Sequence, residues 1–267
     1  HHGKTAMKRA PIILLAAGTV GAFVLSIATT CAQSAPIDFS SAGYAANERP
    51  IPMARIHVVV APKTGDNTAR IQAAINYVSG LKPETNGLRG AVLLLQGRHE
   101  ILGGLTITNS GVVLRGQGPD KTTLVAAGLD RRNLIRMFGE ADVTTAARIA
   151  ITEDVPVGAT TIHVQDSSAF KLGTPIRLTR PSTKEWIVKL GANEFGGGEG
   201  GGWKPGTRDI VWDRTVKAIA GNVVTIDAPI TTAIQNEFGG GYVEPISWPG
   251  RIGHGGIENL TLESTFD

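Results

Sequence analysis

Short apolar runs separated by turn residues dominate residues 90–126 of this 267-residue chain. Four runs, at 91–95, 105–108, 112–114 and 123–125, are rich in Val, Ile, Leu and Thr. They are too short for helices, and Gly, Asn, Asp, Pro or Ser fills the gaps between them, which indicates strands joined by tight turns. Their close and fairly even spacing predicts that the strands wind as successive turns of one β-solenoid.

A helical period precedes these strands and follows a strand-like run at residues 55–61. Four apolar residues recur at the spacing of one helix face: Ile71, Ala74, Ile75 and Val78. The pattern predicts a short amphipathic helix of about three turns, capped at its start by Asp66 or Asn67 and ended by Gly80. Lying across the first solenoid turn, such a helix would cover its open apolar end.

In the second half of the chain, apolar and polar residues alternate strictly instead of forming short apolar runs. Residues 160–164 and 174–179 alternate between apolar and polar side chains, as half-exposed antiparallel strands do. Residues 210–226 are typical of a hairpin with its turn at 220–222. We therefore expect a small antiparallel β insertion over residues 153–240.

A glycine-rich loop lies inside this insertion, since six of the seven residues 196–202 are Gly. Such a segment has too few side chains to pack a core. It is no phosphate-binding loop, because no strand comes closely before it and no helical pattern follows.

The first 35 residues have the order of a secretory signal peptide. Lys8 and Arg9 precede a nearly continuous apolar run at 11–28, and small and polar residues follow at 29–35. This order predicts export to a secreted or periplasmic location in a bacterium. An uncleaved membrane anchor is the alternative, because the run is near the length at which a span becomes possible.

Cys31 is the only cysteine of the chain. A lipoprotein anchor at Cys31 is less favoured than a simple signal peptide, because the residues before it lack the expected Leu and the small Gly or Ala. In either case the exported domain has no disulfide and no thiol chemistry.

The net charge of +3 comes entirely from the leader. Lys4, Lys8 and Arg9 account for it, since removing the first 35 residues leaves 26 − 3 = 23 basic and 23 acidic side chains. The charge therefore gives no reason to expect a nucleic-acid partner, and we expect no membrane contact beyond the leader. We expect a monomer, although no sequence feature excludes an oligomer.

Two stretches resemble a known family. GDNTARIQAAINYV at 65–78 and LLLQGRHEILGGLTITNSGVVLRGQGPDKTTLVA at 93–126 resemble the entry segment of the pectate-lyase-superfamily, right-handed parallel β-helix proteins. The residues that carry the resemblance are Gly65, Asp66, Thr68, Ile71, Gln72, Ala74, Ile75, Gly97, Leu105, Ile107, Gly111, Leu114, Gly116, Gly118, Thr122 and Leu124. The sequence departs at 95–97, where a Pro is usual, and at His99, where Tyr is usual and where we expect a structural role.

The resemblance, which covers about residues 55–127, implies an all-β fold: a right-handed parallel β-helix with an N-terminal capping helix. After the signal peptide we expect a linker at 36–54 and then the capping helix and first coils at 55–152. The antiparallel insertion follows, and residues 241–267 return to the β-helix. Because no terminal cap is visible in the sequence, we expect the chain to be the N-terminal part of a longer protein.

Lyases, hydrolases, epimerases and phage tailspikes share this entry segment, so it names no single activity. In the family, lyases use an Arg or Lys base beside carboxylate-held Ca²⁺, and hydrolases use paired Asp or Glu residues. We expect a polysaccharide lyase or glycosidase acting on an extended glycan, uronic-acid glycans included, with its catalytic residues unassigned. The alternative is a non-catalytic glycan-binding surface protein or tailspike-like adhesin.

Polar and aromatic residues gather in the predicted insertion. The candidates for substrate binding are Trp186, Trp203, Arg208, Trp212, Arg214 and, further along, His254. Tryptophan rings stack on sugars and arginines clamp carboxylates. Asp209 and Asp213, four residues apart on an apparent strand, are candidate ligands for Ca²⁺. The alternatives are that Trp186 and Trp212 fill the core of the insertion and that the aspartates belong to a surface charge ladder.

Overall fold

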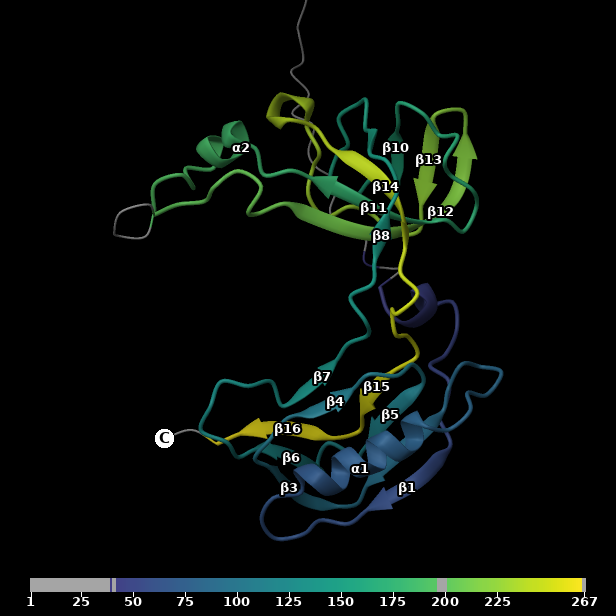
Figure 1. Cartoon of the computed structure of the whole chain (residues 1–267), viewed down its shortest axis with the longest axis vertical. Helices are drawn as coiled ribbons and strands as arrows, with labels where there is room; N and C mark the ends of the chain where they lie inside the picture. Colours follow the sequence, from purple (N-terminus) through teal and green to yellow (C-terminus); the bar gives the residue numbers. More distant parts are fainter. Residues whose placement is uncertain (1–38, 40–41, 196–200, 266–267) are drawn as a thin grey trace, which may run out of the picture. The chain divides into compact units, whose positions relative to one another are not determined.

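A computed structural model describes residue 39, residues 42–195 and residues 201–265. The predicted signal peptide, with Cys31, lies outside the described residues, as does most of the glycine run. Three parallel sheets and one antiparallel sheet make up most of the described chain (Figure 1). Within this described part, no helix has the length and apolar character that crossing a membrane requires.

The chain runs through the three parallel sheets in a repeating order. The first sheet holds β1 (Ile56–Val60), β2 (Gly90–Leu94), β5 (Val112–Arg115) and β15 (Gly256–Glu258); the second holds β3 (Gly97–Ile101), β6 (Thr122–Ala126) and β16 (Thr261–Ser264); the third holds β4 (Leu105–Ile107) and β7 (Ile135–Met137). β2, β3 and β4 are followed by β5, β6 and β7 in the same order, and β15 and β16 later pair with β5 and β6.

Aliphatic side chains from these strands share one core with the helix α1 (Thr68–Ser79). The four residues of the predicted helix face, Ile71, Ala74, Ile75 and Val78, are all buried in it. The predicted amphipathic helix is thus confirmed. Of the two candidate caps, Asp66 accepts the N–H of Thr68 at 2.9 Å, whereas the side chain of Asn67 bonds back to Lys63 and Gly65.

His99 is fully buried in β3, and its Nε2 lies 2.9 Å from the carbonyl oxygen of Leu95. The side chain therefore serves the interior of the parallel region, which agrees with the structural role expected for it.

In two of the three parallel sheets, the first strand has a partner on its outer edge. β1 pairs with β2. For β3, the N–H of Asn67 donates to the carbonyl of Glu100 at 2.8 Å, and Asp66 accepts the N–H of Leu102 at 3.2 Å. The segment that leads into α1 thus satisfies backbone groups that an edge strand leaves unpaired.

The side chain of Gln72 satisfies backbone groups on the outer edge of β4. Its Oε1 accepts the N–H of Thr106 at 2.8 Å, and its Nε2 donates to the carbonyl of Thr106 at 3.0 Å. One side-chain amide therefore replaces a neighbouring strand at this edge. The outer edges of β3 and β4 are thus covered by side chains and backbone of α1 and of the segment before it.

The remaining strands form the antiparallel sheet. Their order is β10 (Thr161–His163), β13 (Val223–Ile226), β12 (Ile210–Ala220), β11 (Pro175–Arg180), β14 (Tyr242–Ser247) and β8 (Thr144–Thr145), and β9 (Ile149–Ala150) also pairs with β14. The predicted hairpin is confirmed as β12 and β13. Antiparallel pairing begins at β8 and ends at β14, so the sheet extends beyond residues 153–240 at both ends.

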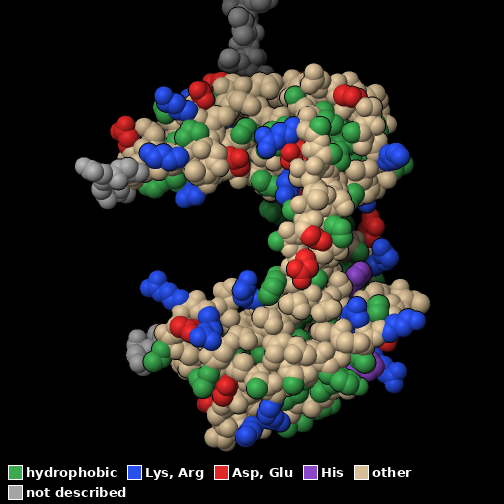
Figure 2. Space-filling model, viewed as in Figure 1, with side chains coloured by type: hydrophobic (Ala, Val, Ile, Leu, Met, Phe, Trp, Pro, Cys, Tyr) green, Lys and Arg blue, Asp and Glu red, His purple; other side chains and the backbone are tan. Residues whose placement is uncertain are grey.

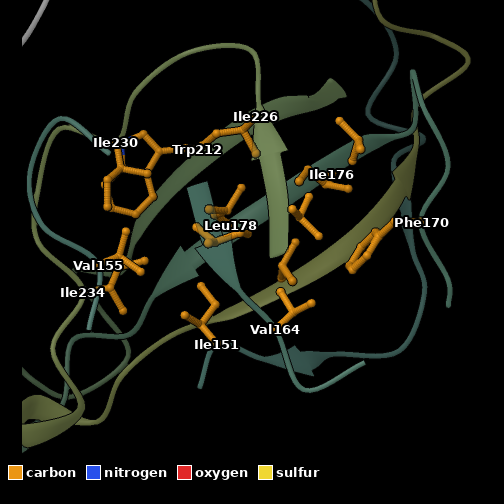
Figure 3. Close-up of a cluster of buried hydrophobic side chains, with 14 residues drawn as sticks. Ile151, Val155, Val164, Phe170, Ile176, Leu178, Trp212, Ile226, Ile230 and Ile234 are labelled. Atoms are coloured by element: carbon orange, nitrogen blue, oxygen red, sulfur yellow. The ribbon is translucent and has the colours of Figure 1, made fainter. Parts of the chain in front are cut away.

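Fourteen buried side chains form the core of the antiparallel region (Figure 3). Ile176 and Leu178 of β11 point into it with Trp212 of β12, which is only 6% exposed. The indole Nε1 of Trp212 donates to the hydroxyl of Thr231 at 3.0 Å, so the ring is buried without leaving its polar atom unpaired. Short helical turns complete the fold: η1 (Tyr44–Asn47), α2 (Lys184–Lys189) and η2 (Asn236–Phe238).

Candidate ligand-binding surface

Three aromatic rings meet on the excursion that joins β11 to β12, which carries α2 (Figure 1). The ring centroids of Trp186 and Trp203 lie 5.9 Å apart with a 31° angle between the planes. Phe195 meets Trp203 edge to face at 6.0 Å and is half exposed. None of the three belongs to the core of the sheet. We call Trp186, Trp203 and Phe195 the aromatic cluster.

The local sequence sets the position of Trp186. Thr183 caps α2 by accepting the N–H of Trp186 at 3.3 Å, and its own hydroxyl donates to the carbonyl of Phe238 at 2.9 Å. Ile187 is buried beneath the helix. A short helix would be marginal on its own, so the cap and this anchor fix which way Trp186 points.

Two arginines accompany the rings. The guanidinium carbon of Arg180 lies 4.0 Å from the ring centroid of Trp186, and that of Arg208 lies 5.7 Å from the ring centroid of Trp203. Both distances are within the range of cation–π attraction. Arg208 is exposed and donates to the carbonyl of Thr207 at 3.0 Å.

Arg180 is the more unusual of the two, because only 2% of it is exposed. Its Nε donates to the carbonyl of Ala233 at 3.1 Å, while its Nη1 is buried with no hydrogen-bond partner. Burial lowers the pKa of this guanidinium, since removal from water disfavours the charged form.

Ser182 ties together the two ends of the excursion. Its N–H and its hydroxyl both donate to one carboxylate oxygen of Asp209 at 2.7 Å. Its hydroxyl oxygen accepts the N–H of Arg208 at 3.0 Å, and its carbonyl accepts the N–H of Gly206, also at 3.0 Å. Asp209, a predicted calcium ligand, therefore closes the base of the excursion. We call these contacts the Ser182 clasp.

Asp213 lies elsewhere, on the outward face of the antiparallel sheet. It accepts from the Nε of Arg177 at 2.9 Å and from the Nη1 of Arg251 at 3.1 Å. Arg177 also lies opposite Glu244, which pairs with Arg148 at 3.1 Å, so charges alternate across the strands as in a ladder. The hydrogen bond from Asp213 is the main cause that raises the pKa of Arg177.

No cluster of three or more His, Cys, Asp or Glu side chains that could hold a metal occurs among the described residues. The two oxygens of Asp213 already face guanidinium groups, and Asp209 serves the Ser182 clasp. These residues therefore do not form the oxygen-rich cage that Ca²⁺ requires, and the Ca²⁺ assignment remains a prediction without a ligand set in this part of the chain.

The structure brings three of the six predicted ligand-binding residues together: Trp186, Trp203 and Arg208. Trp212 fills the core, and Arg214 is tied to backbone carbonyls, among them that of Ala228 at 2.8 Å. His254 lies apart from them; it is exposed, has a backbone φ of 55° and lies against Gly87.

Sequence reasoning missed Phe195 and Arg180. Arg180 could have been found, because it continues the inward positions of Ile176 and Leu178 along β11 and is the one charged residue in that series. A charge at an inward position of a strand is a recognisable sign of an unusual environment. Phe195 borders the glycine run, where no periodicity marks an exposed ring.

Comparison with known proteins gives only distant structural matches. No protein-family model and no curated protein matches the sequence. The tailspike gp61 of Pseudomonas phage phi297 matches with a TM-score of 0.42 and 14% identity, over 74% of this chain and 28% of that one. The Gp54 tailspike of Acinetobacter baumannii bacteriophage AP22, solved in complex with A. baumannii capsular saccharide, matches at 0.39 and 11%, over 73% and 26%.

The tailspike protein gp49 of Pseudomonas phage LKA1 matches at a TM-score of 0.36 and 18% identity, over 67% of this chain and 24% of that one. The chain thus spans about a quarter of the length of these proteins. Its similarity to phage tailspikes is distant and structural.

Proposed function

We propose that this chain is the entry part of an exported, right-handed parallel β-helix protein that binds polysaccharide through the aromatic cluster. Three parallel sheets, entered in a repeating order and covered at one end by α1, support the β-helix. The rings of Trp186, Trp203 and Phe195 carry the binding proposal, because Phe195 is half exposed and the two indoles are partly exposed. An exposed apolar group of this size that takes no part in a core is typical of a ligand surface.

The chemistry of the cluster suits a sugar. A pyranose ring presents flat C–H faces edged by hydroxyl groups, so it stacks on an indole while nearby donors bind its oxygens. Trp203 and Trp186 offer the indole rings, and Arg208, whose guanidinium carbon lies 5.7 Å from the ring centroid of Trp203, supplies N–H donors beside them. The two indoles come from opposite arms of the excursion, so their spacing depends on the Ser182 clasp.

Binding without cleavage is the form of the proposal that the described residues support. Hydrolysis of a glycoside needs two carboxyl groups, one on each side of the scissile bond. Asp209, which directly follows Arg208, is held by Ser182, and Asp213 is held by two arginines. Lyase or glycosidase activity, which the sequence resemblance also implies, stays a prediction that needs residues beyond these.

A binding assay tests the proposal. The chain is titrated with a panel of bacterial capsular and plant polysaccharides, and tryptophan fluorescence and calorimetry report binding. We expect Trp203→Ala to weaken binding at least about tenfold, as loss of a central aromatic anchor does. Trp248→Ala is the matched control, because Trp248 also pairs with an arginine, at 5.1 Å, but lies outside the cluster.

Equal binding by the wild type and by Trp203→Ala would sink the proposed site. New reducing or unsaturated ends during the incubation would show instead that the protein cleaves the glycan. The two readouts are independent, so binding and turnover are scored separately.

A further inference from the structure

Arg180 and Arg208, the two arginines beside the aromatic cluster, have no acidic partner among the described residues. No carboxylate oxygen of the described residues lies within 4.0 Å of a guanidinium nitrogen of Arg180 or Arg208. Of the thirteen other arginines in the described chain, six have such a partner: Arg98, Arg115, Arg132, Arg148, Arg177 and Arg251. Glu185 of α2 is exposed and forms no such ion pair, and Asp209 is already bound by Ser182.

Arg180 makes this lack of an anion costly. A buried cation normally has a carboxylate partner and a full set of hydrogen bonds, because burial removes the water that stabilises its charge. Arg180 has one carbonyl, that of Ala233, and one ring face, that of Trp186, and its Nη1 has no partner. A side chain that only filled the end of β11 would be equally well served by Met or Leu, which carry no such penalty.

We infer that the polysaccharide bound at the aromatic cluster is anionic, and that Arg180 and Arg208 select its charged groups. This inference rests on the proposed binding function. Carboxylate, sulfate and phosphate substituents share the chemistry that a guanidinium recognises. Arg208 is exposed and meets such a group directly. Arg180 lies 4.0 Å from the ring centroid of Trp186, so its charge acts on a group bound beside that ring, through a medium that screens weakly.

Figure 2 shows basic and acidic side chains interspersed over the visible face of the molecule, with no broad field of one sign. The residues after the first 35 also carry 23 basic and 23 acidic side chains, so non-specific attraction of a polyanion is a poor explanation for tight binding to this part of the chain. Selection at the cluster predicts a local effect that depends on both the rings and the two guanidinium groups.

The experiment compares charged and neutral forms of one backbone. The pairs are dextran sulfate with dextran, phosphomannan with mannan, and polygalacturonate with its methyl ester. We expect the charged member of at least one pair to bind ten times more tightly than its neutral form in low salt, and the ratio to fall as sodium chloride rises. The pair that shows the effect identifies the anion.

The variants locate the effect. Arg208→Gln and Arg180→Met should each reduce the charged-to-neutral ratio several-fold, while Arg180→Lys, which keeps the charge, should largely preserve it. Arg136→Gln is the matched control, since Arg136 stacks on Phe138 at 4.7 Å outside the cluster. Circular dichroism shows whether the Arg180 variants fold, and the exposed Arg208 tests the inference if they do not.

The outcomes separate the two claims. Binding of charged and neutral forms with equal affinity, lost in Trp203→Ala, would overturn the anionic ligand and leave polysaccharide binding intact. Binding that Trp203→Ala does not change would overturn both. A preference for charged glycans that survives in Arg208→Gln and Arg180→Met would show that the charge is sensed elsewhere and would also overturn the inference.

Discussion

The two regions of this molecule use their polar side chains in opposite ways. In the parallel region, Asp66 and Gln72 bind strand backbone, so α1 and the segment before it cover the outer edges of β3 and β4. On the excursion of the antiparallel region, two guanidinium groups face aromatic rings and no carboxylate. The polar groups of the first region are therefore matched by strand backbone, whereas Arg180 and Arg208 on the second have no anionic partner among the described residues. Recognition is therefore expected on the excursion.

The largest effect should separate two tryptophans of the antiparallel region. Trp212→Ala leaves a cavity in the core and an unpaired Thr231 hydroxyl, and it should lower the free energy of unfolding by about 3–5 kcal/mol. Trp203→Ala should lower it by about 1 kcal/mol or less, because the ring lies outside the core. Urea denaturation followed by far-UV circular dichroism measures both. Similar losses in both variants would contradict the division between core and binding surface.

A medium effect should come from the closed edge of the parallel region. Gln72→Ala leaves the N–H and the carbonyl of Thr106 without their side-chain partner, at a cost of about 1–3 kcal/mol. Gln165→Ala, at an exposed position whose side chain makes no hydrogen bond in the described structure, should change the free energy of unfolding by less than about 0.5 kcal/mol. If the two variants lose the same stability, Gln72 does not act as a substitute strand.

The smallest effect should be a change in how the stability of the protein depends on acidic pH. Hydrogen bonds from the hydroxyl of Thr68, then from the N–H groups of Thr68 and Leu102, lower the pKa of Asp66 below its ordinary value of 3.8. Since the folded state favours the carboxylate, this stabilisation is present above pH 3.8 and is lost as the pH falls through the lowered folded-state pKa. Asp66→Asn should therefore be less stable at neutral pH and should lose less stability on acidification. Urea midpoints measured from pH 6 to pH 2.5 test this, and parallel curves would refute it.

The periodic parts of the fold could be predicted from the sequence. Burial in one core requires apolar residues at regular spacing along each element. That spacing is visible in the sequence for the buried face of α1 and for the strands β2, β4, β5 and β6. β8, with two residues, is too short to show any period. The pairing of β15 with β5 joins residues far apart in the chain, and no local pattern encodes it.

The candidate site was predictable only in part. The aromatic and basic composition of the insertion pointed to Trp186, Trp203 and Arg208, but composition could not distinguish Trp212, whose inward position along β12 places it in the core. Trp186 and Trp203 meet because the returning arm of the excursion bonds to the arm that carries α2, as the N–H of Gly206 does to the carbonyl of Ser182. Such a return depends on hydrogen bonds such as that from the N–H of Trp203 to the carbonyl of Ala192, which leave no mark on the sequence pattern.

The Ser182 clasp has an evolutionary consequence. Because Ser182 and Asp209 join the two chain segments where they leave the sheet, the register of β11 with β12 does not depend on what lies between them. The entropy of closing a loop grows slowly with its length, so residues 183–207 can be lengthened, shortened or exchanged at little cost to the scaffold. Recombination at these two residues would therefore exchange the whole excursion, and any ligand that it binds, in a single step.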